Sequence, residues 1–234
     1  MVRVNSIRPG VAAGLLGALL MLAATGSWAE DIPAAIGRIS YGADPRPGDA
    51  ICTGVLVAPD LVLTASHCVR DAAETPEAIR FDAGWSAGSP SGRRQGAEVI
   101  LISKVVAPEL SGLVEDVALV VLDAAFPPDA FPPLPLADAA SGPFTLIAFD
   151  RTAPDQPRNS GTCVPLANPP GLLALGCAVV SGNSGAPLLE RDGNGWRVVA
   201  VMVASAKGWP VRSWAVLPPT QVRLRIAQRI AGLE

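Results

Sequence analysis

Short apolar runs separated by turn-forming residues follow one another from Ile36 towards the C-terminus. Each run has the length of a strand, several are rich in β-branched residues, and Gly, Pro, Asp or Ser bounds each one. The runs lie at 55–57, 61–63, 99–102, 117–122, 144–149, 172–175 and 198–203. This rhythm is typical of a barrel or a sandwich rather than of alternating strands and helices, and it predicts an all-β fold.

Only the segment from Thr220 to Leu233 has a clearly helical pattern, in which apolar positions mix with arginines directly after Pro218-Pro219. The pattern predicts a C-terminal helix. The segment from Gly84 to Gly96 is rich in Gly, Ser and Arg and is interpreted as an exposed loop.

The Pro-rich stretch 126–135 predicts a stiff connector, because proline restricts the backbone and donates no ladder hydrogen bond. It divides the remaining chain into an N-terminal part, 30–125, and a C-terminal part, 136–234.

The first 29 residues have the pattern of a signal peptide. Arg3 and Arg8 form a positive region, an uncharged apolar stretch of about 14 residues follows, and Ser27-Trp-Ala29 offers small residues for cleavage after Ala29. An uncleaved N-terminal anchor is the alternative, although a membrane-spanning helix needs about 20 apolar residues. Because no second long apolar run follows, we expect a secreted or periplasmic protein without stable membrane insertion after cleavage.

Charge and composition narrow the function further. Half of the 234 residues are hydrophobic and 17% are charged, which allows a large buried core. Cleavage at Ala29 would remove two of the 18 basic residues and none of the 21 acidic ones, leaving a net charge of −5. Lys104 and Lys207 are the only lysines, and no basic cluster occurs, so nucleic acid is not expected as a partner.

Four cysteines, Cys52, Cys68, Cys163 and Cys177, accompany a single histidine. An even number of cysteines in an exported chain indicates two disulfides, for which three pairings are possible. A zinc site would require closer C-x-x-C spacing or further histidines, so disulfides are favoured. No metal or other cofactor is expected.

Three short motifs carry the chemistry. They are Leu63-Thr-Ala-Ser-His67-Cys68, Asp116-Val-Ala-Leu119 and Gly182-Asn-Ser184-Gly-Ala-Pro187. Their order and spacing resemble the chymotrypsin-like (trypsin-like) serine proteases, with the Gly-Asn-Ser-Gly form closer to bacterial members. The resemblance extends over about residues 36–229 and implies two packed, six-stranded antiparallel β-barrels with the catalytic triad at their interface.

A serine hydroxyl needs a base within hydrogen-bond reach, and a buried carboxylate must orient that base. His67 is the single histidine, so it is the candidate base. The resemblance selects Asp116 over its neighbour Glu115, and Ser184 over the nearby hydroxyl of Ser181. The motif order His, Asp, Ser disfavours an esterase or lipase with a Gly-x-Ser-x-Gly signature.

The amides of Gly182 and Ser184 are the expected oxyanion hole. Cys52 and Cys68 flank one predicted hairpin, while Cys163 and Cys177 flank another, so these are the expected disulfides. In the family, the first of these bonds supports the catalytic histidine.

Departures from the family concern activation and specificity. Asn183 stands where many animal members have an aspartate that receives a newly cut N-terminus, which puts that activation in doubt. The expected specificity pocket, formed by Ala178, Met202, Val203, Ala204 and Ser205, carries no charge. We therefore expect a serine endopeptidase that cleaves protein or peptide substrates after small or apolar residues. The alternative is a catalytically inactive homologue that acts as a binding module.

Overall fold

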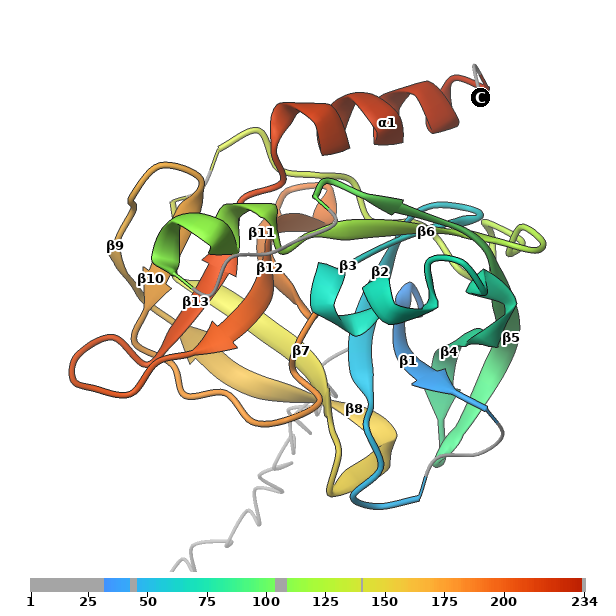
Figure 1. Cartoon of the computed structure of the whole chain (residues 1–234), viewed down its shortest axis with the longest axis horizontal. Helices are drawn as coiled ribbons and strands as arrows, with labels where there is room; N and C mark the ends of the chain where they lie inside the picture. The colour runs from blue at the N-terminus through green and yellow to red at the C-terminus, as the bar shows by residue number, and fades with distance from the viewer. Residues whose placement is uncertain (1–31, 43–45, 104–108, 140, 233–234) are drawn as a thin grey trace, which may run out of the picture.

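The computed structural model describes residues 32–42, 46–103, 109–139 and 141–232. The signal peptide expected over residues 1–29 lies outside the described residues. Two β units make up most of the described chain, with one α-helix at its C-terminal end (Figure 1). Among the described residues, none of the helices is long and apolar enough to cross a membrane.

The first unit is a closed, six-stranded antiparallel barrel. Its hydrogen-bonded order is β1-β2-β3-β6-β5-β4, which confirms the first of the two predicted barrels. The strands are β1 (Ile36–Tyr41), β2 (Cys52–Ala58), β3 (Leu61–Thr64), β4 (Ile79–Ser86), β5 (Ser89–Leu101) and β6 (Ala118–Leu122).

The second unit is a seven-stranded sheet with the order β8-β7-β11-β12-β13-β10-β9, so a second closed six-stranded barrel is not confirmed. The strands are β7 (Phe144–Asp150), β8 (Ala153–Cys163), β9 (Pro165–Ala167), β10 (Leu172–Leu175), β11 (Pro187–Asp192), β12 (Gly195–Ser205) and β13 (Ser213–Val216).

Both edge strands of this sheet contain proline. The two edge strands, β8 and β9, are separated in the chain by Val164 alone, so the sheet must curl until its edges approach each other. However, β8 contains Pro154 and Pro157, and β9 begins at Pro165. Because proline has no N–H to donate to a ladder, it is confined largely to sheet edges.

The prediction of an exposed loop over residues 84–96 is wrong, because this segment forms most of a β-hairpin. β4 and β5 pair up to Ser86 and Ser89, and the turn between them places Ala87 and Gly88 at φ of 49° and 81°. One face of β5 is largely solvent-exposed, and Arg93 on that face donates to the buried carboxylate of Asp82 at 2.7 Å. A strand with one solvated face has the polar composition of a loop, which explains the error.

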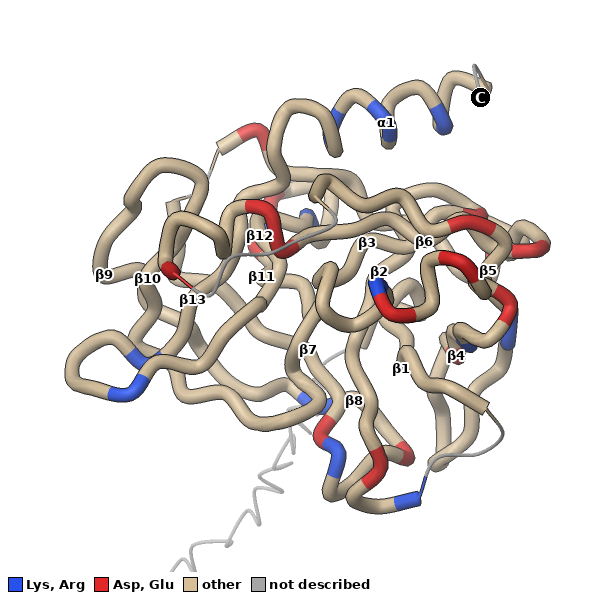
Figure 2. The backbone as a smooth tube through the Cα atoms, in the orientation of Figure 1, with Lys and Arg blue, Asp and Glu red and all other residues tan. Residues whose placement is uncertain are grey.

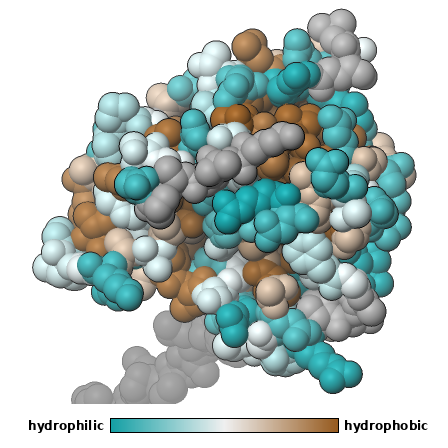
Figure 3. All heavy atoms as spheres, viewed as in Figure 1, coloured by the Kyte–Doolittle hydropathy of each residue, from teal (hydrophilic) through white to brown (hydrophobic). Residues whose placement is uncertain are grey.

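The predicted C-terminal helix is present as α1 (Thr220–Ile230), three residues shorter than the predicted segment. Val222 and Ile226, one turn apart, are buried in the same core as the barrel strands. Arg229 binds both carboxylate oxygens of Asp60, at 3.1 and 2.6 Å, and so fixes the helix to the β2–β3 turn. Figure 3 shows apolar residues gathered on the side of the molecule where α1 packs.

The two units share a core. The largest buried cluster combines barrel residues with Ile147 of β7, Leu189 of β11 and Val201 of β12. The Pro-rich segment adds Phe126 and Phe131 to it, and Phe126 lies 6.1 Å from Phe81 of β4, measured between ring centroids. Packing across the junction fixes the position of one unit against the other, and the candidate site lies there.

Candidate active site

His67 and Asp116 come from the ends of two paired strands. His67 lies in a short 3₁₀-helix, Ser66–Cys68, directly after β3. Asp116 lies between another 3₁₀-helix, Leu110–Glu115, and β6. Because Thr64 of β3 pairs with Ala118 of β6, the register of the barrel brings the two side chains together.

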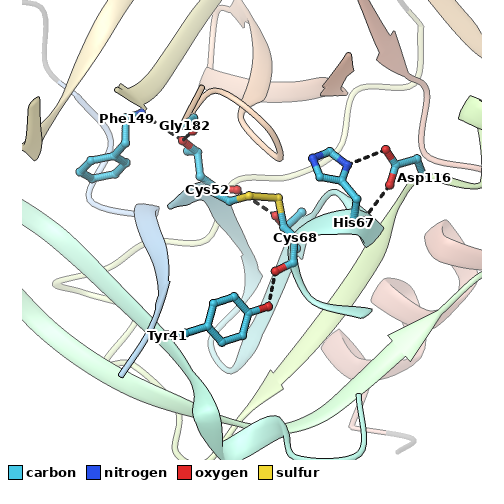
Figure 4. Close-up of a disulfide and its surroundings, with 9 residues drawn as sticks. Tyr41, Cys52, His67, Cys68, Asp116, Phe149 and Gly182 are labelled. Atoms are coloured by element: carbon cyan, nitrogen blue, oxygen red, sulfur yellow. Dashed lines mark hydrogen bonds and ion pairs between the residues drawn. A yellow bond between two sulfur atoms is a disulfide. The ribbon is translucent and has the colours of Figure 1, made fainter. Parts of the chain in front are cut away.

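Both carboxylate oxygens of Asp116 contact His67. Oδ2 lies 2.7 Å from the ring Nδ1, and Oδ1 accepts the His67 backbone N–H at 2.8 Å (Figure 4). The carboxylate is buried, whereas neighbouring Glu115 is exposed. This geometry favours a tautomer with the proton on Nδ1, which leaves the lone pair of Nε2 available to accept a proton.

Ser184 lies in a turn in which almost all backbone N–H and C=O groups form hydrogen bonds. Ser181 O accepts Arg151 N–H at 3.0 Å, and Gly185 N–H donates to Met202 O at 2.8 Å. The carbonyls of residues 182, 183 and 184 and the N–H of residue 183 have partners as well. In the described part of the chain, the N–H groups of Gly182 and Ser184 have no hydrogen-bond partner. Backbone N–H groups of folded proteins rarely lack partners, so these two free donors, which belong to residues that line one cavity, are a candidate anion-binding site.

Close packing of this turn against the barrel requires glycine at position 185. The backbone has φ of +78°, and a Cβ would lie 2.1 Å from Thr64 Oγ1 and 2.2 Å from Thr53 O.

Asn183, which is 3% exposed, forms hydrogen bonds with both ends of its side-chain amide. Its Nδ2 donates to Phe149 O at 2.8 Å, and its Oδ1 accepts Val180 N–H at 2.9 Å. A neutral side chain therefore fixes the turn where many animal members of the resembled family have an aspartate.

His67, Gly182 and Ser184 line one cavity of about 360 Å³ at the junction of the two units. A second cavity, of about 590 Å³, is also lined by Ser184. Met202, Ala204 and Ser205 of the expected specificity pocket line the second cavity. Ala178 and Val203 are not among its lining residues: Ala178 is exposed and Val203 is buried in the core.

Sequence reasoning missed the charged residues beside these cavities. Asp150 and Arg151 line the second cavity, and Arg151 also borders the first. Thr152 donates its N–H and its hydroxyl to Asp150 Oδ1, both at 2.8 Å, and the backbone hydrogen bond is the main cause that lowers the pKa of Asp150. These residues form the β7–β8 turn, which no motif marks.

Two disulfides join the pairs expected from the sequence. Cys52–Cys68 closes a 16-residue separation and Cys163–Cys177 a 14-residue separation. The first lies beside His67, with Gly182 on the other side of it (Figure 4). Its sulfurs lie within 4.8 Å of a ring nitrogen of His67. Because both sulfurs are consumed in the bond, this group does not offer thiolate ligands to a metal.

Charge elsewhere on the surface is dispersed. Lysine and arginine are spread over several elements in Figure 2, with no continuous basic stripe on the face shown.

Tyr41, at the end of β1, lines the same cavity as His67 and Ser184, and its phenol donates a hydrogen bond to Cys68 O. Burial, and then the charge of Asp71, raise the pKa of Tyr41 above its ordinary value.

Residues 52–201 match the family model of the trypsin-like peptidase domain. No curated protein matches the chain. Solved structures with the same fold include a Glu endopeptidase (19% identity, TM-score 0.63), which covers 85% of this chain and 91% of its own. They also include protease Anisep from Arthrobacter nicotinovorans (17% identity, TM-score 0.61), with 86% of this chain and 96% of that chain covered. A third is the scabies mite inactivated protease paralogue S-D1 (15% identity, TM-score 0.62), with 85% of this chain and 93% of that chain covered.

Proposed function

The chain belongs to the trypsin-like peptidase family of serine endopeptidases, and we propose that His67, Asp116 and Ser184 are its catalytic triad. One arrangement supports the proposal most strongly. The Asp116-bound ring of His67 lines the same cavity as Ser184 and Gly182, and the N–H groups of Gly182 and Ser184 are free.

In this mechanism Ser184 Oγ attacks the carbonyl carbon of the scissile bond while His67 Nε2 takes the hydroxyl proton. Asp116 keeps the ring in the required tautomer and stabilises the imidazolium. The N–H groups of Gly182 and Ser184 donate to the oxyanion that forms, a contribution of about 3–4 kcal/mol per donor in related sites. His67 then protonates the leaving amine, and water hydrolyses the acyl-enzyme on Ser184 by the same steps in reverse order.

We assign the cavity of about 590 Å³ to the side chain that precedes the scissile bond. Its walls include Val179, Val180, Met202 and Ala204, while Asp150 and Arg151 contribute one charge of each sign. This lining favours small or apolar side chains, because an apolar side chain gains about 1.5–3 kcal/mol on burial. The opposite charges of Asp150 and Arg151 leave the lining without a net negative charge to pair with a buried cation.

Peptides that differ only in the residue before the cut test this preference through kcat/KM. We expect Ala, Val or Leu to exceed Lys by about two orders of magnitude, since each 1.4 kcal/mol is tenfold. A preference for Lys or Arg that disappears in Asp150→Asn would show instead that Asp150 reads a cation.

The alternative function is a catalytically inactive homologue that binds a partner. The inactivated mite paralogue shows that this fold occurs without catalysis. Against this alternative stand the buried Asp116 carboxylate on His67 and the two free donors of the nucleophile turn.

Labelling with a fluorophosphonate probe separates the two functions. We expect the protein to react, Ser184→Ala to lose labelling, and Ser181→Ala to keep it, because Ser181 offers an exposed hydroxyl in the same turn. Turnover of a peptide substrate by the labelling-competent protein then establishes protease activity. Absence of labelling in a correctly folded protein would favour the binding module.

We also propose export to the periplasm or the extracellular space, with cleavage after Ala29. Two disulfides are consistent with an oxidising compartment. Intact mass measurement of the exported protein tests this directly, since the expected chain begins at Glu30. Retention of residues 1–29 would indicate an anchor instead.

A further inference from the structure

Thr53 connects the barrel to the nucleophile turn through its side chain. It belongs to β2 and is completely buried. Its hydroxyl donates to Gly182 O at 2.8 Å and accepts the Phe149 N–H at 3.0 Å. A single buried hydroxyl thus joins three segments, which are a barrel strand, a strand of the second sheet and the turn that carries Ser184.

The backbone of Thr53 strengthens the same connection. Its N–H donates to Ser184 O at 2.8 Å, and its carbonyl accepts the hydroxyl of Thr64 at 2.8 Å. The side chain and the backbone of one barrel residue therefore bind the carbonyls on either side of Asn183. No other described residue of the barrel donates to both of these carbonyls.

Gly182 needs such a connection because its own conformation is weakly determined. Its φ is +105°, a region that glycine enters and leaves without a steric penalty. The direction of its N–H therefore depends on the hydrogen bonds on either side. Arg151 N–H fixes the preceding carbonyl, of Ser181, while the Thr53 hydroxyl fixes the carbonyl of Gly182 itself.

We propose that Thr53 is a positioning residue for the oxyanion site, whose hydroxyl keeps the N–H groups of Gly182 and Ser184 directed at the position of the oxyanion. This inference rests on the proposed function of the site. Thr53 is fully buried and is not among the lining residues of either cavity, so it acts through the turn and not on the substrate. Its loss therefore weakens stabilisation of the transition state while the His67–Asp116 pair stays intact.

Thr53→Val tests the proposal, because it removes the hydroxyl and keeps the shape and the backbone N–H. We expect kcat to fall about 10- to 100-fold, less than or equal to the loss of a whole oxyanion donor, with KM changed less than about threefold. Affinity for a peptide aldehyde, which forms an oxyanion on Ser184, should fall by a similar factor. Affinity for a non-covalent competing peptide should not change, and the acid limb of the pH profile should stay in place.

Two further variants separate positioning from general stability. Thr53→Ser keeps the hydroxyl and should recover most of kcat. Thr64→Val is the matched control, since Thr64 is an equally buried threonine whose hydroxyl donates to Thr53 O and packs against Gly185 without a hydrogen bond to the turn. It should lose stability with little change in the affinity ratio of aldehyde to competing peptide. If Thr53→Val does not fold, Thr53→Ala removes the same hydroxyl without adding a methyl group in its place.

The outcomes are distinguishable. If the parent protein labels with fluorophosphonate and Thr53→Val keeps its kcat within about threefold, the role of Thr53 is wrong while the proposed function stands. If Thr64→Val lowers aldehyde affinity as much as Thr53→Val does, the effect is structural and the proposal is also wrong. A parent protein that never labels would overturn the proposed function and, with it, the role of Thr53.

Discussion

The barrel and the second sheet each supply one half of the site, and they hold it in different ways. In the barrel, His67 comes just after β3 and Asp116 just before β6, and these two strands pair with each other. The disulfide Cys52–Cys68 reinforces the turn that carries His67. In the second unit, Ser184 lies in a turn outside any strand. That turn is fixed by Arg151 of the β7–β8 turn and by Thr53 of the barrel.

This difference indicates where the site is most sensitive. The base and its carboxylate form a unit whose geometry follows from the register of β3 and β6 in the barrel. The nucleophile and the oxyanion donors depend on the junction between the two units, so changes there should affect catalysis without disturbing the His67–Asp116 pair. The experiments below test this division.

Removal of the nucleophile or of the base should have the largest effect. We expect Ser184→Ala and His67→Ala each to lower kcat by about 10⁵- to 10⁶-fold, and the double variant to be little worse than either single one. The halves of the site act on one proton transfer, so their losses do not add. Single-turnover kinetics on a peptide ester measure all three variants. Additive losses would show that the two halves act separately.

Asp116→Asn should follow, with kcat reduced about 10³- to 10⁴-fold because an amide favours the wrong tautomer of His67. Glu115→Gln is its matched control, since Glu115 is adjacent in the chain but exposed. It should change kcat less than about twofold. A large loss in Glu115→Gln with a small one in Asp116→Asn would reverse the assignment of the carboxylate.

The sequence predicted the barrel half of the site better than the junction between the two units. The motif around His67 and the start of β6 are local, so the residues predicted there are the ones that the barrel register brings together. Thr53 was not singled out, because its partner Gly182 is 129 positions away and no local pattern connects them. Arg151 and Asp150 were missed for the same reason. The open second sheet was not foreseen, because its edge strands β8 and β9 contain no long apolar run and were not predicted as strands.

Gly185→Ala tests the junction itself. A Cβ at position 185 would overlap Thr64 Oγ1 and Thr53 O and would also require a left-handed backbone. We expect unfolding free energy to fall by at least about 3 kcal/mol, with loss of fluorophosphonate labelling. Gly88→Ala has a similar φ of +81° but open space around its Cβ, and it should cost only about 1–2 kcal/mol with labelling retained. Equal losses in the two variants would mean that backbone strain alone, not contact with the barrel, explains the effect.

The two disulfides sharpen the comparison because they close separations of 16 and 14 residues. Replacing both cysteines of either pair by alanine should therefore cost about 2–4 kcal/mol in each case. Activity should separate them: loss of Cys52–Cys68, beside His67, should lower kcat/KM more than loss of Cys163–Cys177 at the same stability. Denaturant unfolding and peptide turnover at low temperature measure both quantities. Equal kcat/KM in the two double variants would show that the first disulfide does not support the base.

The smallest expected effect concerns Tyr41, which lines the same cavity as His67 and donates a hydrogen bond to Cys68 O. Burial, the larger cause, and Asp71 raise the pKa of Tyr41 in the folded protein. A raised pKa in the folded state contributes stability that is fully present below the unfolded value, about 10, and is lost as the pH rises through the folded value. Tyr41→Phe should therefore be less stable than the parent by up to about 1 kcal/mol near neutral pH, because one hydrogen bond is removed. Above pH 10 the difference should shrink as the parent loses the same bond. Tyr41 is the only tyrosine, so tyrosinate absorbance reports its ionisation directly. If tyrosinate appears at the same pH in the folded and the unfolded protein, the phenol does not support the turn that carries His67.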